Sequence, residues 1–98
     1  STVAPQALFL LNSPLVEQVS RRLAEQSLAS PPDQDAERID RLYRRVLGRP
    51  ALPRETHAAR QFLADVRPAL PGEDPGDLDA WQALSHVLLA SNEFIYLR

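Results

Sequence analysis

Apolar residues recur at every third or fourth position along much of the chain. The clearest series follows Asp35, where apolar side chains occupy positions i, i+3, i+4, i+7 and i+8: Ile39, Leu42, Tyr43, Val46 and Leu47. Residues at this spacing lie on one side of an α-helix. No run of alternating β-branched and polar residues bounded by turns is present in the sequence. The pattern therefore predicts an all-α fold.

Prolines mark the starts of the first two predicted helices. A short helix over residues 5–11 can open with a proline in its first turn. Asn12 or Ser13 can cap the next helix, which has Pro14 in its first turn and is expected to end near Leu28. The side chains expected to face inward on this second helix are Leu15, Val16, Val19 and Leu23.

Turn residues also bound the third predicted helix. Asp35 can cap its start, and Gly48 fits the position just past its end, where glycine adopts a left-handed backbone at little cost. Pro50 then prevents the helix from continuing. The end of this helix is therefore strongly marked.

The remaining prolines predict two more helices separated by an irregular segment. Pro53 starts the fourth helix, whose expected inward side chains are Ala58, Ala59, Phe62, Leu63 and Val66. Residues 68–76 are too rich in proline and glycine for regular structure. Asp77 can cap the last helix, which places Trp81, Leu84, Leu88 and Ile95 on one face. We expect a small bundle of four main helices plus a short N-terminal helix, in a single domain over residues 1–98.

The composition excludes several classes of partner. The 98 residues are 44% hydrophobic and 24% charged, as in ordinary globular proteins, and the formal net charge is −2. Nucleic acids and anionic membranes attract proteins with a basic footprint, which this balance does not suggest. No apolar run approaches the roughly 18 residues of a membrane-spanning helix. We therefore expect no nucleic-acid partner and no membrane insertion.

Residues with catalytic or metal-binding potential are few. The chain has no cysteine, and its two histidines, His57 and His86, are too far apart for a His-x-x-x-His metal pair. The acidic residues between 73 and 79 lack the spacing of a calcium-binding EF-hand loop. The three glycines do not form a phosphate-binding or dinucleotide-binding motif. We expect no metal, no cofactor and no enzymatic activity.

Arginine side chains form a stripe along the third predicted helix. Arg38, Arg41, Arg45 and Arg49 follow one another at helical spacing, and all eleven basic residues of the chain are arginine. Arginine forks suit carboxylates, so this stripe is a candidate surface for docking a protein partner. The alternative is an ordinary solvated face, because Glu37–Arg41 and Asp40–Arg44 form i, i+4 pairs in the favourable order.

An apolar segment near the N-terminus is a second candidate for an interaction surface. Residues 7–11 are apolar on every side of the predicted short helix, so one side lacks an obvious partner within a small bundle. The candidate contact residues are Leu8, Phe9 and Leu11. The alternative is that neighbouring helices of the same chain cover this segment on all sides.

Three stretches of the chain resemble the C-terminal part of a planctomycete-specific domain of unknown function. They are Ser1–Pro14, Arg41–Pro50 and Ala80–Tyr96. The second contains the element Leu-Tyr-x-x-x-Leu-Gly-Arg-x-Pro, except that Pro50 follows Arg49 directly. That domain ends large exported proteins that often carry a cytochrome-c-like domain upstream. The resemblance implies export of a parent protein and supplies no site residues. The haem-attachment motif Cys-x-x-Cys-His is absent from this sequence.

These observations predict a non-catalytic interaction or structural module of a larger exported bacterial protein. The chain begins with Ser1 rather than methionine, and we interpret it as the C-terminal fragment of that protein. Its expected partner is protein, either the remainder of the parent chain or a second copy in a homodimer. The alternative is an accessory domain that completes the site of an upstream hydrolase or redox module, with His57, Trp81 and His86 as its best local candidates.

Overall fold

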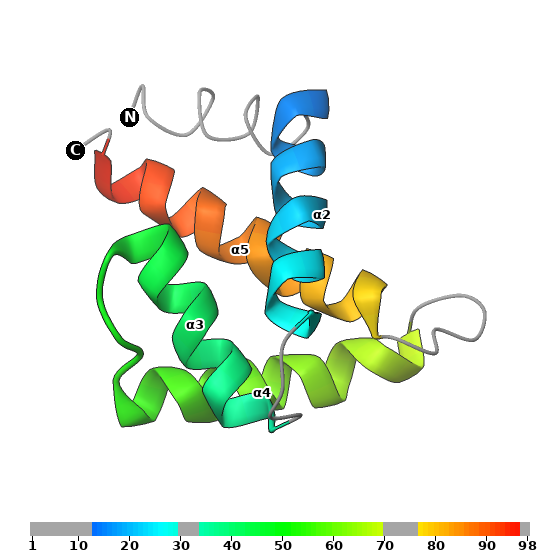
Figure 1. The fold of residues 1–98 in the computed structure, drawn as a ribbon, viewed down its shortest axis with the longest axis vertical. Helices are drawn as coiled ribbons and strands as arrows, with labels where there is room; N and C mark the ends of the chain where they lie inside the picture. Colours follow the sequence, from blue (N-terminus) through cyan, green and yellow to red (C-terminus); the bar gives the residue numbers. More distant parts are fainter. Residues whose placement is uncertain (1–12, 30–33, 70–76, 97–98) are drawn as a thin grey trace.

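The computed structural model describes residues 13–29, 34–69 and 77–96, with the backbone alone over 92–96. Its helices are α2 (Pro14–Leu28), α3 (Asp35–Leu47), α4 (Pro53–Val66) and α5 (Leu78–Tyr96), and a short 3-10 helix, η1 (Arg67–Ala69), continues α4 (Figure 1). These ranges contain no strand, which confirms the predicted all-α fold and its four main helices. The short helix expected over residues 5–11 lies outside the described residues, as does the side chain of Ile95.

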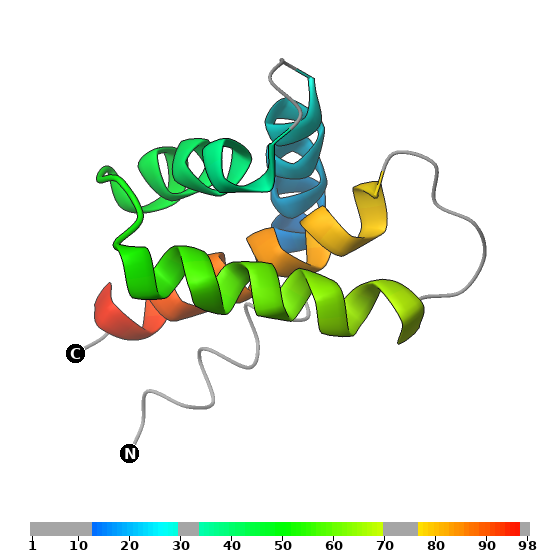
Figure 2. The ribbon, with the colours of Figure 1, turned by 90° about the horizontal axis from the view of Figure 1, so that it is seen from below.

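Helix α5 lies at the centre of the bundle. It contacts α2, α3 and α4, and its interface with α2 is the most extensive between any two described helices. Helices α3 and α4 are joined by a tight connection and cover another side of α5, while α2 crosses α5 steeply (Figures 1 and 2). The buried residues of α2, α3 and α4 belong to one core with the buried residues of α5 between Ala80 and Leu88.

The core confirms most of the predicted apolar stripes. Trp81 is fully buried on α5, and Ile39, Leu42 and Leu63 are fully buried around it on α3 and α4. The other buried apolar residues are Ala24, Tyr43, Ala59, Ala80, Leu84 and Leu88. Val46, Leu47, Phe62 and Val66 pack against this core as partly buried residues. Ala58 was expected to face inward but is exposed, so the prediction is wrong at that position, whereas the neighbouring Ala59 is buried as predicted.

Helix α2 is oriented differently from the prediction. Leu15 is 65% exposed and Val19 is 39% exposed, whereas Ser20, Ala24 and Ser27 are fully buried. The expectation that Leu15 and Val19 face inward is therefore wrong. Small side chains allow the backbones of two helices to approach closely, and the serine hydroxyl groups are satisfied within their own helix. Ser20 donates to the carbonyl oxygen of Glu17 at 2.9 Å, and Ser27 donates to that of Leu23 at 2.9 Å.

Polar contacts help to set the position of α2 along the axis of α5. Gln82 of α5 donates from its amide nitrogen to the carbonyl oxygen of Glu17 at 3.2 Å. Arg21 donates to the amide oxygen of the same glutamine at 3.4 Å. Because both groups of one side chain are engaged by α2, Gln82 contributes to a defined register between the two helices.

The start of α3 differs by one residue from the prediction. The N-cap is Gln34, whose carbonyl oxygen accepts from the amide of Arg38 at 3.2 Å, and no side chain caps the helix. Asp35 is the first helical residue, and its carboxylate instead lies 3.5 Å from a guanidinium nitrogen of Arg67. At the other end, Gly48 has φ +72° and donates to the carbonyl oxygen of Arg44, which confirms the predicted stop.

Arg67 links the ends of three helices. From the end of α4, its guanidinium contacts Asp35 at the start of α3 and Asp77 directly before α5, the latter at 2.8 Å. Asp77 has a left-handed backbone with φ +55°, which aspartate tolerates better than most residues. Its carbonyl oxygen accepts from the amide of Trp81 at 3.0 Å, so Asp77 stands at the predicted start of the last helix.

Candidate interaction surfaces

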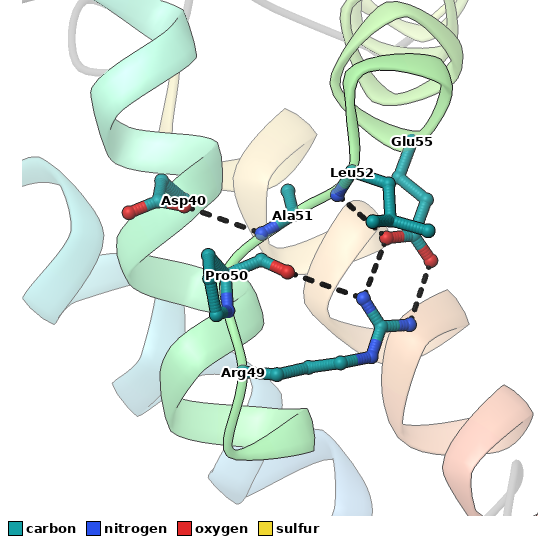
Figure 3. A network of polar contacts seen from close by, with 6 residues as sticks. All are labelled: Asp40, Arg49, Pro50, Ala51, Leu52 and Glu55. Atoms are coloured by element: carbon teal, nitrogen blue, oxygen red, sulfur yellow. Dashed lines mark hydrogen bonds and ion pairs between the residues drawn. The ribbon is translucent and has the colours of Figure 1, made fainter.

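The connection between α3 and α4 is held by a two-pronged ion pair. Arg49 donates to Glu55 through both terminal nitrogens, with Nη1–Oε1 at 2.7 Å and Nη2–Oε2 at 2.8 Å (Figure 3). Arg49 also donates to the carbonyl oxygen of Pro50 at 3.1 Å. Glu55 additionally accepts from the backbone amide of Leu52 at 2.8 Å, which satisfies an amide at the start of α4. The two side chains thus bind each other and also bind backbone groups of the turn between α3 and α4.

A second carboxylate holds the same connection from the α3 side. One oxygen of Asp40 accepts from the backbone amide of Ala51 at 3.2 Å (Figure 3). The other oxygen accepts from Arg44 Nε at 2.7 Å. Successive backbone amides of the turn, those of Ala51 and Leu52, are therefore bound by carboxylates from the two helices that the turn joins. We name this network of Asp40, Arg44, Arg49 and Glu55 the turn clamp.

The turn clamp changes the acidity of its carboxyl groups. The hydrogen bond from Arg49 lowers the pKa of Glu55 from 4.5 to about 2, and the backbone hydrogen bond from Leu52 acts in the same direction. The hydrogen bond from Arg44 lowers the pKa of Asp40. Burial raises the pKa of the neighbouring Tyr43. Both clamp carboxylates are thus charged at neutral pH, where they bind the turn most strongly.

The four arginines predicted to form a docking stripe have different surroundings. Arg49 is exposed but belongs to the turn clamp through Glu55. Arg38 and Arg41 are half-buried, and each has an interaction partner. Arg45 is exposed on α3. The stripe therefore presents its outward charge mainly around Arg45 and the neighbouring Arg44, whose side chain is 60% exposed beside Asp40.

The other predicted contact residues, Leu8, Phe9 and Leu11, lie outside the described residues. The structure instead shows an apolar surface on α2 that the sequence pattern did not predict. An open groove runs along this helix between two rows of side chains, one apolar and one polar. The lining residues are Leu15, Gln18, Val19, Arg22, Leu23 and Gln26, which we call the α2 groove.

The α2 groove was missed because the apolar stripe of this helix was assigned to the core. A signal was nevertheless present in the sequence, since Ser20, Ala24 and Ser27 are small residues spaced by four and three positions. A series of small residues allows two helices to pack closely. The face of α2 that carries it is therefore an alternative to the leucine and valine face as the buried one. Here Ser20, Ala24 and Ser27 are buried and Leu15 and Val19 are exposed, while Leu23 packs against the core as a partly buried residue.

The residues proposed for an accessory catalytic site differ in their burial. Trp81 is fully buried in the core, where its indole nitrogen has no hydrogen-bond partner. His57 is exposed on α4, and His86 is half-buried on α5, where it has an interaction partner. None of the three lines the α2 groove. Within residues 13–29, 34–69 and 77–96, no group of histidine, aspartate and glutamate side chains is arranged to hold a metal ion.

None of the helices in the described part of the chain combines the length and the apolar character that crossing a bilayer requires.

Comparison with protein families gives a match to the model named PSD1, described as a protein of unknown function (DUF1553), over residues 1–63. This range includes α2, α3, the turn clamp and most of α4. No curated protein and no solved structure matches the chain.

Proposed function

The chain belongs to the PSD1 family of proteins of unknown function (DUF1553), and we propose that it is a non-catalytic helical module that docks another polypeptide. The observation that carries this proposal is the α2 groove. Leu15 is 65% exposed and Val19 is 39% exposed on a helix that is held in the fold by the fully buried Ser20, Ala24 and Ser27. Apolar rows that remain in solvent within a small, well-packed domain are typical of protein interaction sites.

Two further features of the chain support the same role. The outward charge around Arg45 and Arg44 on α3 can bind carboxylates of a partner. The apolar residues Leu8, Phe9 and Leu11 add a second hydrophobic contact in this proposal. The partner is the remainder of a longer parent protein or a second copy of the chain.

We further propose that the parent protein is an exported planctomycete protein that carries this chain at its C-terminus. The family match over residues 1–63 supports membership of the domain family. The resemblance of the segments at 1–14, 41–50 and 80–96 to the end of that domain supports the C-terminal position and export. A secretion assay with the parent protein tests this placement directly.

Single-cysteine labelling tests the docking proposal, because the chain has no cysteine of its own. Leu15→Cys is introduced into the 98-residue chain and into the full-length protein, and the rate of maleimide labelling is measured in each. We expect rapid labelling in the isolated chain and labelling slowed about tenfold or more in the full-length protein. Equal rates in both would contradict docking through α2.

Ala64→Cys provides the matched control. Ala64 is exposed on α4 and does not line the α2 groove. Its labelling rate should be the same in the isolated chain and in the full-length protein.

Light scattering of the isolated chain over a concentration series tests whether the partner is a second copy of the chain. Protection of the thiol in the Leu15→Cys variant that develops only at concentrations where a dimer forms would identify a second copy as the partner.

A further inference from the structure

We infer that the α2 groove binds an amphipathic α-helix that carries acidic side chains beside its apolar stripe. This inference rests on the proposed docking function and specifies the chemistry of the partner. It is carried by three features of the groove: the arrangement of its two rows, its single charge and its length.

The two rows have the geometry of a helix-packing surface. Leu15, Val19 and Leu23 form an apolar row at intervals of four residues, and a polar row runs parallel to it at the same interval. Rows at this interval are the ridges between which the side chains of a second helix fit. The groove spans twelve residues of α2, so it is about 17 Å long and matches about three turns of a partner helix.

The charge of the groove favours an acidic partner. Arg22 is its one charged lining residue among those described, and no acidic side chain lines it. Among the hydrogen bonds and ion pairs of residues 13–29, 34–69 and 77–96, none involves Arg22. A carboxylate beside the apolar stripe of the partner would therefore meet an available guanidinium.

The same charge disfavours a symmetric dimer through this face. In an isologous contact each copy presents the same surface to the other, so the Arg22 side chains of both copies would enter the contact and no acidic lining residue would pair with them. The described lining also contains no aromatic residue, which a proline-rich extended ligand requires, and the described residues offer no sheet edge for an added strand. A helix with acidic flanks is the partner that remains.

The test measures binding of two designed helical peptides to the 98-residue chain by fluorescence anisotropy. Both peptides carry leucines one turn apart on a single face; one has glutamates beside this stripe, and the other has lysines at the same positions. We expect the glutamate peptide to bind at least about tenfold more tightly than the lysine peptide, with the difference decreasing as salt rises.

Two variants locate the binding site and its charge. Val19→Glu places a charge within the apolar row at a partly exposed position, so the fold should persist while binding of the glutamate peptide is lost. Arg22→Glu should reverse the preference, so that the lysine peptide binds more tightly. Arg60→Glu, at an exposed position on α4, is the control and should leave the preference unchanged. Circular dichroism confirms that each variant is folded.

Each other outcome overturns the inference. Equal binding of the two peptides, no binding of either, or binding that persists in the folded Val19→Glu chain would each exclude an acidic helix in the α2 groove. Slow labelling of Leu15→Cys in the isolated monomeric chain would show that a segment of the chain itself occupies the groove. Failure of the docking function is detected separately, because the thiol of Leu15→Cys would then be labelled equally fast in the full-length protein.

Discussion

The guanidinium group of Arg49 binds both carboxylate oxygens of Glu55, at 2.7 and 2.8 Å, across the connection between α3 and α4. This pair gives the Leu47-Gly48-Arg49-Pro50 part of the sequence a structural explanation. Gly48 ends α3, Arg49 reaches forward to α4, and Pro53 begins that helix. A stretch that resembles a family motif thus specifies a turn, and one arginine of the predicted docking stripe is used within the fold.

Replacing Glu55 by glutamine should destabilise the chain by about 1 kcal/mol. The amide cannot accept from both nitrogens of Arg49 and carries no charge, so the two-pronged pair is lost. The free energy of unfolding can be measured by urea denaturation. Glu25→Gln, at an exposed position on α2, is the control and should change the free energy by less than about 0.5 kcal/mol. Equal effects of the two variants would show that the clamp does not stabilise the turn.

Replacing Arg49 by lysine should also destabilise the chain, even though the positive charge is kept. Lysine has no planar fork, so it cannot bind both oxygens of Glu55 and the Pro50 carbonyl in the same geometry. The urea midpoint of Arg49→Lys should lie below that of the wild type, and that of Arg60→Lys should not. An unchanged midpoint for Arg49→Lys would mean that charge alone accounts for the interaction.

The stability of the chain should fall in acid partly through Glu55. Its pKa in the folded chain is lowered from 4.5 to about 2, so its contribution is fully present above the unfolded pKa and is lost as the pH falls through the folded value. The difference in unfolding free energy between the wild type and Glu55→Gln should therefore narrow from about pH 5 down to about pH 2. A difference that stays constant over this range would contradict the lowered pKa.

There is room for a side chain at Gly48, but its left-handed backbone conformation is unfavourable for most other residues. No atom lies within 4 Å of the position that a Cβ atom would occupy, yet φ is +72°. Gly48→Ala should therefore lower stability by about 1 kcal/mol through backbone strain alone. Gly48→Asn should cost less, because asparagine adopts the left-handed conformation more readily. Thermal denaturation compares the two, and equal losses would point to a steric cause.

The two faces of α2 should respond oppositely to changes in side-chain size. Ala24→Leu adds volume to a fully buried position against α5 and should cost about 1–3 kcal/mol. Leu15→Ala removes most of a leucine side chain from an exposed position and should change the free energy of unfolding by less than about 0.5 kcal/mol. Denaturation of both variants checks the orientation of the helix. A large loss for Leu15→Ala with a small one for Ala24→Leu would show that the apolar row faces the core.

The sequence by itself determined the helical fold and most of its boundaries, because these depend on neighbours within a few residues. Proline at the starts of α2 and α4, and glycine after α3, act through the local backbone. The stripe on α3 was also readable, because Ile39, Leu42 and Tyr43 have no competing apolar face on that helix.

The i, i+4 pair of Asp40 and Arg44 was readable from the sequence, but only the tertiary structure decided which face of α2 is buried and where the side chains of Arg49, Glu55 and Arg67 are bound. On α2, close approach to α5 favours Ser20, Ala24 and Ser27 over a bulkier apolar row, and that outcome depends on a helix more than fifty residues away. Arg67 and Asp35 are likewise brought together by packing rather than by helical spacing. The apolar surface that best supports a function therefore arises from the competition between two faces of α2 for α5, which periodicity alone does not resolve.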